Sequence, residues 1–319
     1  MKNRLLIYFF YDKDGIVDDY VTYFLQAFKP YCKEICVVVN GYLQEESEKK
    51  LKQNANNVML RENIGYDSCA YKHAIEYYGY EELKKYDEVI LANFTMFGPI
   101  FTPDKMFREM EQIDCDFWGI TKHPATTYTM AGVKVNEHVQ SYFIAYKKNI
   151  LESDDFKKYW QTLQVPTNYE EAVAFHELRG TEYFESKGYK SATYINPDKY
   201  RTLLEHKPYF YYIGQQIIAD SMPFIKRKIF SIKKGMLELP IEDSIPLLFK
   251  YIEKTNYPIC LIIENLRRTM PVNQINYFSL TSKYIFLTIK RWIIPSKAKK
   301  YIKRRDTIND ILYLLNLIK

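Results

Sequence analysis

The sequence predicts an α/β fold with a mixed, mostly parallel sheet flanked by helices. Continuous apolar runs at residues 5–10 and 35–40 are typical of strands buried on both faces, and a third short strand is expected at 58–61. Between them, residues 18–28 show helical apolar spacing, and residues 45–54 form a charged segment typical of an exposed helix. This alternation favours a doubly wound sheet with right-handed crossovers. The sequence contains no GxGxxG or GxxxxGK[ST] motif, which argues against a dinucleotide site or a P-loop.

The alternation of strands and helices continues to about residue 195. A helix is expected from the polar loop 62–67 to residue 78, followed by a second helical turn. Further strands are expected at 87–92, 114–121, 138–146 and 192–195, and further helices at 103–112, 154–163 and 169–187. The polar segment 122–137 has the length of a binding loop. We therefore expect an α/β domain over residues 1–200, a helical extension over 201–275 that completes it, and a basic amphipathic tail over 276–319.

The composition allows a large core and indicates a reduced, cytoplasmic setting. Apolar residues make up 47% of the 319 residues. The five cysteines show no CxxC spacing, which favours buried free thiols. The first predicted strand begins close to Met1, so we expect no signal peptide, and no apolar run is long enough to predict a helix that spans a membrane.

The net charge of +6 is unevenly distributed. Residues 283–305 contain nine Lys or Arg and no Asp or Glu, interleaved with aromatic and aliphatic side chains. A basic amphipathic helix of this kind suits an anionic membrane surface, so we expect a peripheral location at the inner face of the cell membrane. A solvated helix packed on the domain and a docking segment for a partner enzyme are the alternatives. No recognition motif supports nucleic acid as a partner.

Two polar clusters follow strands of the predicted sheet, at residues 62–67 and 93–99. Because ligands bind at the carboxyl ends of the strands in open α/β sheets, the two clusters predict one site. Taken singly, each residue could instead have only a structural role: Asn63 and Gly65 would shape a turn, and Asp67 would cap a helix.

Several stretches occur in the order and spacing of a known family. They are Glu62-Asn63-x-Gly65-x-Asp67, LANFTMFGP (91–99), DFWGIT (116–121), HVQSYFIAYKKNILESDDFKKYW (138–160), FHELRGTEYFESKGY (175–189) and Pro223-Phe224-Ile225-Lys226-Arg227-Lys228. Over roughly residues 3–270, the chain resembles the rhamnan synthesis protein F family of bacterial glycosyltransferases. The resemblance implies a GT-A-like fold. It also implies transfer of a sugar, with rhamnose as one candidate, from a nucleotide diphosphate sugar to a growing cell-surface polysaccharide or lipid-linked glycan.

The resemblance and the strand-end positions together assign donor binding to five residues. They are Asn63, Gly65, Asp67, Asn93 and Thr95. Gly65 would permit close approach of the backbone to the ligand. Asp67 could accept a hydrogen bond from a ribose or sugar hydroxyl.

An inverting transfer needs a general base for the acceptor hydroxyl. Glu177 is the first candidate, because the resemblance places its helix near the acceptor; a merely solvated carboxylate is the alternative. His123 and His138 adjoin the predicted cleft and are the next candidates. On the acceptor side, the implied contacts are Gln140, Ser141 and Tyr142, together with Trp118 if it stacks on a sugar rather than joining the core.

The sequence leaves a requirement for Mg²⁺ or Mn²⁺ open. The family often has Asn-Asp-Ser where this chain has Asn93-Phe94-Thr95, and often an Arg where Tyr66 stands. Asp114-Cys115-Asp116 has the Asp-x-Asp spacing of a metal motif, but it precedes its strand. It is therefore expected at the other end of the sheet, in a structural role.

Two other functions are compatible with the sequence. A nucleotidyltransferase uses a similar sheet, but it would need a glycine-rich basic phosphate loop near the N-terminus, which the sequence lacks. A non-catalytic scaffold of the polysaccharide assembly machinery would explain the departures at Tyr66 and Phe94. Nucleotide binding distinguishes the enzyme from the scaffold.

Overall fold

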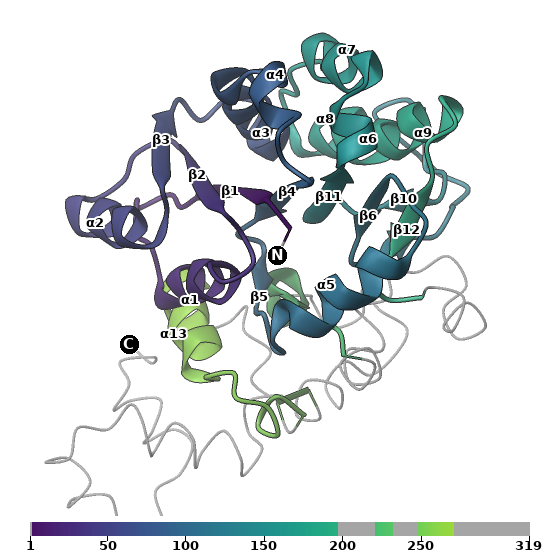
Figure 1. Cartoon of the computed structure of the whole chain (residues 1–319). Coiled ribbons are helices and arrows are strands. Elements are labelled where there is room, and N and C mark those ends of the chain that lie inside the picture. Colours follow the sequence, from purple (N-terminus) through teal and green to yellow (C-terminus); the bar gives the residue numbers. More distant parts are fainter. Residues whose placement is uncertain (1, 197–220, 232–247, 250, 271–319) are drawn as a thin grey trace, which may run out of the picture.

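A computed structural model describes residues 2–196, 221–231, 248–249 and 251–270 (Figure 1). Its centre is a seven-stranded sheet with the strand order β12-β6-β11-β4-β1-β2-β3. These strands are β1 (Arg4–Tyr11), β2 (Glu34–Asn40), β3 (Asn57–Arg61), β4 (Glu88–Asn93), β6 (Phe117–Gly119), β11 (Phe143–Lys147) and β12 (Ser191–Thr193). Strands β3, β2, β1 and β4 run parallel, β12 is parallel to β6, and β11 is antiparallel to both β4 and β6. The predicted mixed, mostly parallel sheet is confirmed.

Helices cover both faces of this sheet (Figure 1). One layer consists of α1 (Asp19–Phe28), α2 (Glu45–Asn54), α5 (Pro103–Gln112) and α13 (Cys260–Thr269). The other consists of α3 (Tyr66–Tyr78), α4 (Tyr80–Leu83), α6 (Lys148–Leu151), α7 (Asp154–Thr162), α8 (Tyr169–Ala172) and α9 (Arg179–Ser186). Because side chains alternate along a strand, Leu6 and Tyr8 of β1 pack against the first layer, whereas Leu5 and Ile7 pack against the second.

The predicted strand at 138–146 is two strands in different sheets. Strand β10 (His138–Val139) pairs with β7 (Lys122–His123), whereas β11 belongs to the central sheet. Between them the Gln140 N–H donates to the Thr121 carbonyl at 3.1 Å, and Gln140 Oε1 accepts from the Thr121 hydroxyl at 2.9 Å. These bonds hold the chain where it leaves one sheet for the other.

Two further predicted segments contain more structure than expected. The predicted loop 122–137 holds β7 and a hairpin of β8 (Thr129–Met130) and β9 (Val133–Lys134). The predicted helix 169–187 is α8, a π-helical turn η1 (Val173–Leu178) and α9. Gly188 ends α9 with a φ of 90°, as its predicted role as a C-terminal stop requires.

Trp118 belongs to a buried polar network at the amino ends of β1 and β4. The Arg4 guanidinium contacts Glu88 Oε2 at 2.5 Å, and Glu88 Oε1 accepts a hydrogen bond from the Trp118 indole N–H at 3.1 Å. The Trp118 ring packs on Phe107 and Phe143 and is 0% exposed. Its predicted role as a sugar contact is therefore wrong, because no ligand can reach the ring.

The segment after residue 220 forms a small two-stranded sheet with the chain that follows β4. Strand β13 (Ile225–Lys226) pairs antiparallel with β5 (Met96–Phe97), which follows β4, and η3 (Arg227–Ser231) continues from it. The predicted helical extension 201–275 thus contributes a strand as well as α13. Residues 201–220, 232–247, 250 and 271–275 of that extension, and the whole tail 276–319, lie outside the described residues.

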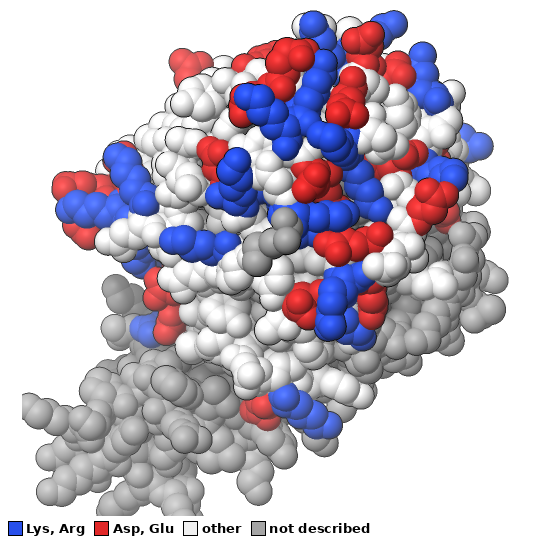
Figure 2. All heavy atoms as spheres, in the orientation of Figure 1, with Lys and Arg blue, Asp and Glu red and all other residues white. Residues whose placement is uncertain are grey.

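Figure 2 shows Lys and Arg interleaved with Asp and Glu over the face that it draws. On α2 and α5, opposite charges pair at one-turn spacing, as in Lys49–Glu45 and Arg108–Asp104. This face of the described residues therefore presents no extended field of one sign that would steer a polyanion.

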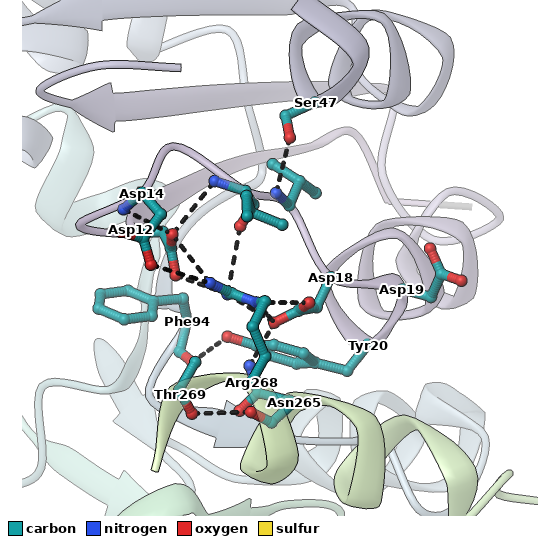
Figure 3. Close-up of polar contacts among 12 residues, drawn as sticks. Asp12, Asp14, Asp18, Asp19, Tyr20, Ser47, Phe94, Asn265, Arg268 and Thr269 are labelled. Atoms are coloured by element: carbon teal, nitrogen blue, oxygen red, sulfur yellow. Dashed lines mark hydrogen bonds and ion pairs between the residues drawn. The ribbon is translucent and has the colours of Figure 1, made fainter. Parts of the chain in front are cut away.

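Arg268 of α13 ties the C-terminal part of the described chain to the loop after β1 (Figure 3). Its Nη2 lies 2.6 Å from Asp12 Oδ2 and 2.7 Å from Asp18 Oδ2. Burial by itself would raise the pKa of Asp12, but the hydrogen bonds from Arg268 and from the Ile16 N–H hold that pKa below its ordinary value. The two carboxylates and the guanidinium thus fix the loop that leaves β1.

We expect Arg268→Ala to lower the free energy of unfolding at neutral pH by about 2 kcal/mol, because it leaves two partly buried carboxylates without their cation. A carboxyl with a lowered folded pKa stabilises the protein above its unfolded pKa of about 4, and that stabilisation is lost as the pH falls through the folded pKa. The difference between wild type and variant should therefore shrink below about pH 4.

Urea unfolding at pH 7 and at pH 3.5 measures this difference, with the exposed neighbour Arg267→Ala as the control. Two results would contradict the role of the Arg268 ion pairs. One is an equal loss of stability in Arg267→Ala, and the other is a stability difference between wild type and Arg268→Ala that is the same at pH 3.5 as at pH 7.

Candidate functional site

A cavity of about 690 Å³ opens at the carboxyl ends of β1, β3 and β4. It is lined by Tyr11 and Asn93, the last residues of β1 and β4, and by the loop that joins β3 to α3. Residues 165–173, around α8, form an opposing wall. This edge of the sheet is where open α/β folds bind ligands, so the cavity is the candidate functional site.

The β3–α3 loop has a backbone conformation that few residue types adopt. Gly65 and Tyr66 have positive φ angles of 72° and 55°. A Cβ on Gly65 would lie 2.2 Å from Cys69 Sγ, so only glycine fits there. The Asn40 amide donates to the Tyr66 carbonyl at 3.2 Å and lies 3.4 Å from Asn63 Oδ1. The neighbouring strand β2 therefore holds the loop in place.

We expect Gly65→Ala to destabilise the protein by more than about 2 kcal/mol, because the new methyl group must displace Cys69 in addition to straining the backbone. Gly188→Ala is the matched control: its φ is also positive, but a Cβ there would have no neighbour within 4 Å. It should cost about 1 kcal/mol. Chemical unfolding of both variants checks the difference, and equal costs would contradict the close contact.

Asn93 joins the two strand ends that the sequence placed at one site. Its Nδ2 donates to Asp67 Oδ2 at 3.0 Å, and its Oδ1 accepts from the Thr95 hydroxyl at 2.6 Å. Burial and the nearby Glu177 raise the pKa of Asp67 to about 6, although the bond from Asn93 acts in the opposite direction. Asp67 also accepts from the Ser68 N–H in the first turn of α3, but Gly65 is the N-cap of that helix, so Asp67 is a cavity residue rather than the predicted cap.

Glu177 reaches the cavity from the π-helical turn η1. Its Oε2 accepts from the Ser141 N–H at 2.8 Å and from the Ser141 hydroxyl at 2.6 Å, and its Oε1 lies 3.4 Å from His138 Nε2. Burial would raise the pKa of Glu177, but His138, the Lys226 charge and Ser141 outweigh it and hold the pKa well below its ordinary value. This carboxylate is therefore a fixed anion. π-turns inside helices are frequent at functional sites.

The two histidines predicted as further bases lie behind Glu177. Their rings stack with centroids 5.2 Å apart, and His138 is 2% exposed. His138 Nδ1 pairs with the Asn136 carbonyl at 2.7 Å, and His123 Nδ1 pairs with the Pro124 carbonyl at 2.8 Å. Neither ring lines the cavity. Their position suits a role in holding Glu177 rather than in contacting a substrate.

Lys226 is a cavity residue to which the sequence assigned no role. Strand β13 carries it to the site, and the neighbouring Arg227 N–H donates to the Thr95 carbonyl at 2.9 Å. Lys226 Nζ lies 5.6 Å from the centre of the Tyr142 ring. Burial holds the pKa of Lys226 below its ordinary value, although Glu177 and Asp67 act in the opposite direction. The basic run 226–228 was the sequence feature that could have suggested a role for Lys226, but nothing in the sequence indicated that this run lies beside Thr95.

Most of the predicted site residues lie together. Those that line the cavity are Asn63, Gly65, Asp67, Asn93, Thr95, Ser141, Tyr142 and Glu177. Gln140 is 3% exposed and bonds to Thr121, so it supports Tyr142 from behind and does not reach the cavity. Asp116 does precede β6, and Asp114 pairs with Lys190 on the surface, away from the cavity.

The described residues contain no group of three His, Cys, Asp or Glu side chains that could hold a metal ion. The carboxylates that line the cavity are Asp67 and Glu177. In many nucleotide sites Mg²⁺ is bound by one or two carboxylates together with substrate phosphates. Both oxygens of each carboxylate already have partners: Asp67 accepts from Asn93 and from the Ser68 N–H, and Glu177 pairs with Ser141 and His138.

Two other features of the chain bear on its expected setting. All five cysteines are free thiols, four of them buried. Among the helices of the described residues, none is long and apolar enough to cross a bilayer.

Comparison with known proteins identifies the family. Residues 35–305 match the family described as rhamnan synthesis protein F, and the chain belongs to this family. A curated relative, the uncharacterized protein y4gN of Sinorhizobium fredii, is 20% identical over 164 residues, a match that covers 51% of this chain and 41% of that protein. The match thus spans about two fifths of the relative's length.

The solved structures that resemble part of the chain include two enzymes at low identity. One is core-mannan synthase A from Aspergillus fumigatus in a Mn/GDP form, with 11% identity, coverage of 58% of this chain and 70% of that chain, and a TM-score of 0.34. Another is 4-diphosphocytidyl-2C-methyl-D-erythritol synthase from Anaerococcus prevotii, with 10% identity, coverage of 60% and 87%, and a TM-score of 0.38. The assignment to a family rests on the match over residues 35–305.

Proposed function

We propose that this protein is a glycosyltransferase that binds a nucleotide diphosphate sugar in the cavity at the carboxyl ends of β1, β3 and β4. It transfers the sugar, with rhamnose as the family's suggestion, to a cell-surface glycan or lipid-linked acceptor. The observation that carries the proposal is the convergence of Asn93, Asp67, Glu177 and Lys226 on one cavity in a member of this family. Amides, carboxylates and a cation in one cleft match the chemistry of a nucleotide sugar.

Donor binding would rest on the two strand-end clusters and on Lys226. The amides of Asn63 and Asn93 and the Thr95 hydroxyl can bond to ribose, sugar and phosphate oxygens. Lys226 supplies positive charge for the diphosphate that leaves when the glycosidic bond forms. A bound Mg²⁺ or Mn²⁺ would supply further charge to the same phosphates.

Glu177 and Asp67, the two carboxylates of the cavity, would have different roles towards the acceptor. Glu177 is held as an anion by Ser141 and His138, which suits charge stabilisation and positioning better than proton transfer. Asp67 has a pKa of about 6, close to the pH at which a cytoplasmic base must act. The raised pKa of Asp67, together with its place in the cavity wall, therefore favours Asp67 over Glu177, the first candidate from the sequence, as the acceptor of the hydroxyl proton.

A calorimetric panel of UDP, GDP, dTDP and CDP, with and without Mg²⁺ or Mn²⁺, tests donor binding. We expect one nucleoside diphosphate to bind, and Lys226→Met to weaken that binding at least about tenfold, because a charge-assisted phosphate contact is lost. Lys105→Met is the control, since Lys105 lines a second cavity of about 570 Å³ beside α5.

The outcomes of the panel separate the rival functions. No binding of any nucleotide to a well-folded protein would favour the scaffold. Binding that is weakened by Lys105→Met and unaffected by Lys226→Met would place the nucleotide in the wrong cavity.

If Asp67 is the base, kcat/KM should fall about tenfold per pH unit below its pKa, because the protonated carboxyl cannot accept a proton. The fall should begin near pH 6, the pKa of Asp67. Asp67→Asn, which keeps an oxygen for the bond from Asn93, should lose turnover and still bind nucleotide. A pH–rate profile that is flat between pH 5 and 7, or a fully active Asp67→Asn enzyme, would exclude this role.

The membrane contact proposed for residues 283–305 concerns a segment outside the described residues, and it stays a prediction.

A further inference from the structure

The mouth of the cavity carries a cluster of exposed apolar side chains. We call Ile64, Tyr66, Val165 and Tyr169 the rim; their exposed fractions are 51%, 39%, 54% and 59%, and all four line the same cavity. Large apolar side chains that are exposed singly need no explanation, but a cluster at a cavity mouth indicates a binding surface.

The rim is built from two loops that are distant in sequence and touch in space. A Cβ on Gly65 would lie 3.3 Å from Val165 Cγ1, so the β3–α3 loop packs directly against the loop before α8. The second loop is fixed by its own contacts: Asn168 Oδ1 accepts from the Glu171 N–H at 2.9 Å, and Glu171 Oε2 accepts from the Thr167 N–H at 2.8 Å. These hydrogen bonds fix the turn at which Tyr169 begins α8.

Tyr66 occupies its place at a cost in backbone energy. Its φ of 55° lies in the left-handed region, which a bulky residue seldom adopts. The conformation is imposed by the neighbouring Gly65 and by the bond from Asn40 to the Tyr66 carbonyl. Strain of this kind persists where the surrounding structure enforces it, and it is concentrated at ligand sites.

The chemistry of the rim differs from that of the inner cavity. Asn93 and Lys226, which suit phosphates, are less exposed than the rim tyrosines. The rim itself offers two phenol rings and two aliphatic side chains in the same cavity as Asp67 and Glu177, and Lys228 Nζ lies over one face of the Tyr169 ring, 5.7 Å from its centre. The C–H face of a sugar ring packs on the electron-rich face of an aromatic ring, while its hydroxyls donate to carboxylates. A neutral pyranose ring matches both requirements.

We propose that the rim binds a pyranose ring of the acceptor glycan, with Tyr66 and Tyr169 as its stacking residues. This inference rests on the proposed glycosyl transfer and names the class of acceptor group that enters the same cavity. It places the acceptor sugar at the mouth and the donor diphosphate inside, so that the acceptor hydroxyl faces Asp67.

Saturation-transfer NMR with a panel of methyl pyranosides, recorded on the full chain, tests the inference. We expect at least one methyl pyranoside to bind the wild type, Tyr66→Ala and Tyr169→Ala each to weaken its binding about tenfold, and Tyr66→Phe and Tyr169→Phe to retain it, because the ring provides the contact. Tyr42→Ala and Tyr77→Ala are matched controls, since both tyrosines are more exposed than the rim tyrosines and neither lines the cavity.

The inference is overturned if no pyranoside binds the wild type or if the rim alanine variants bind it as well as the wild type does. It is also overturned if the phenylalanine variants lose as much pyranoside affinity as the alanine variants. Equal binding of octanol and an octyl pyranoside would also overturn it, by indicating a site for an apolar chain. Nucleotide calorimetry on the same samples separates the two proposals. Nucleotide binding without pyranoside binding contradicts only the rim assignment, and the reverse contradicts only the donor site.

Discussion

The hydrogen bond from Asn93 Nδ2 to Asp67 Oδ2, 3.0 Å long, joins the ends of two parallel strands into one site. Asn93 ends β4 and Asp67 lies in the first turn of α3, after β3. Strands β1 and β2 separate these two strands in the sheet, so a polar contact between their ends must bridge the cavity floor. Thr95 is tied to the same bond, because its hydroxyl donates to Asn93 Oδ1.

The electrostatic balance of the cavity follows from that arrangement. Two carboxylates in a largely desolvated space repel one another, and the fold resolves the repulsion unequally. Glu177 receives Ser141, His138 and the Lys226 charge, whereas Asp67 receives the Asn93 amide and carries a raised pKa. One group is thus a permanent anion and the other can exchange a proton near neutral pH. That division is the physical basis for assigning them different roles.

The sequence was sufficient for the sheet and for much of the site. Buried parallel strands are near-continuous apolar runs, and the rule that ligands bind at strand ends is enough to predict that Asn63, Asp67 and Asn93 lie together. The break at Gln140 escaped prediction because residues on both sides keep a strand pattern, and only the bonds to Thr121 separate them.

Other features depend on contacts between distant parts of the chain. The sequence allowed Trp118 a place in the core or against a sugar, and its bond to the buried Glu88 places it in the core. Lys226 reaches the site through β13, which pairs with β5 far away in sequence. The π-helical turn that carries Glu177 has no sequence signature that distinguishes it from an α-helix.

The most direct test of the central claim is a crystal structure of the full chain with the nucleoside diphosphate that binds most tightly. The account predicts the diphosphate beside Lys226 and the Asn93–Thr95 turn, with Asp67 still bonded to Asn93. A nucleotide in the cavity between α1 and α5, lined by Tyr31 and Lys105, would contradict it.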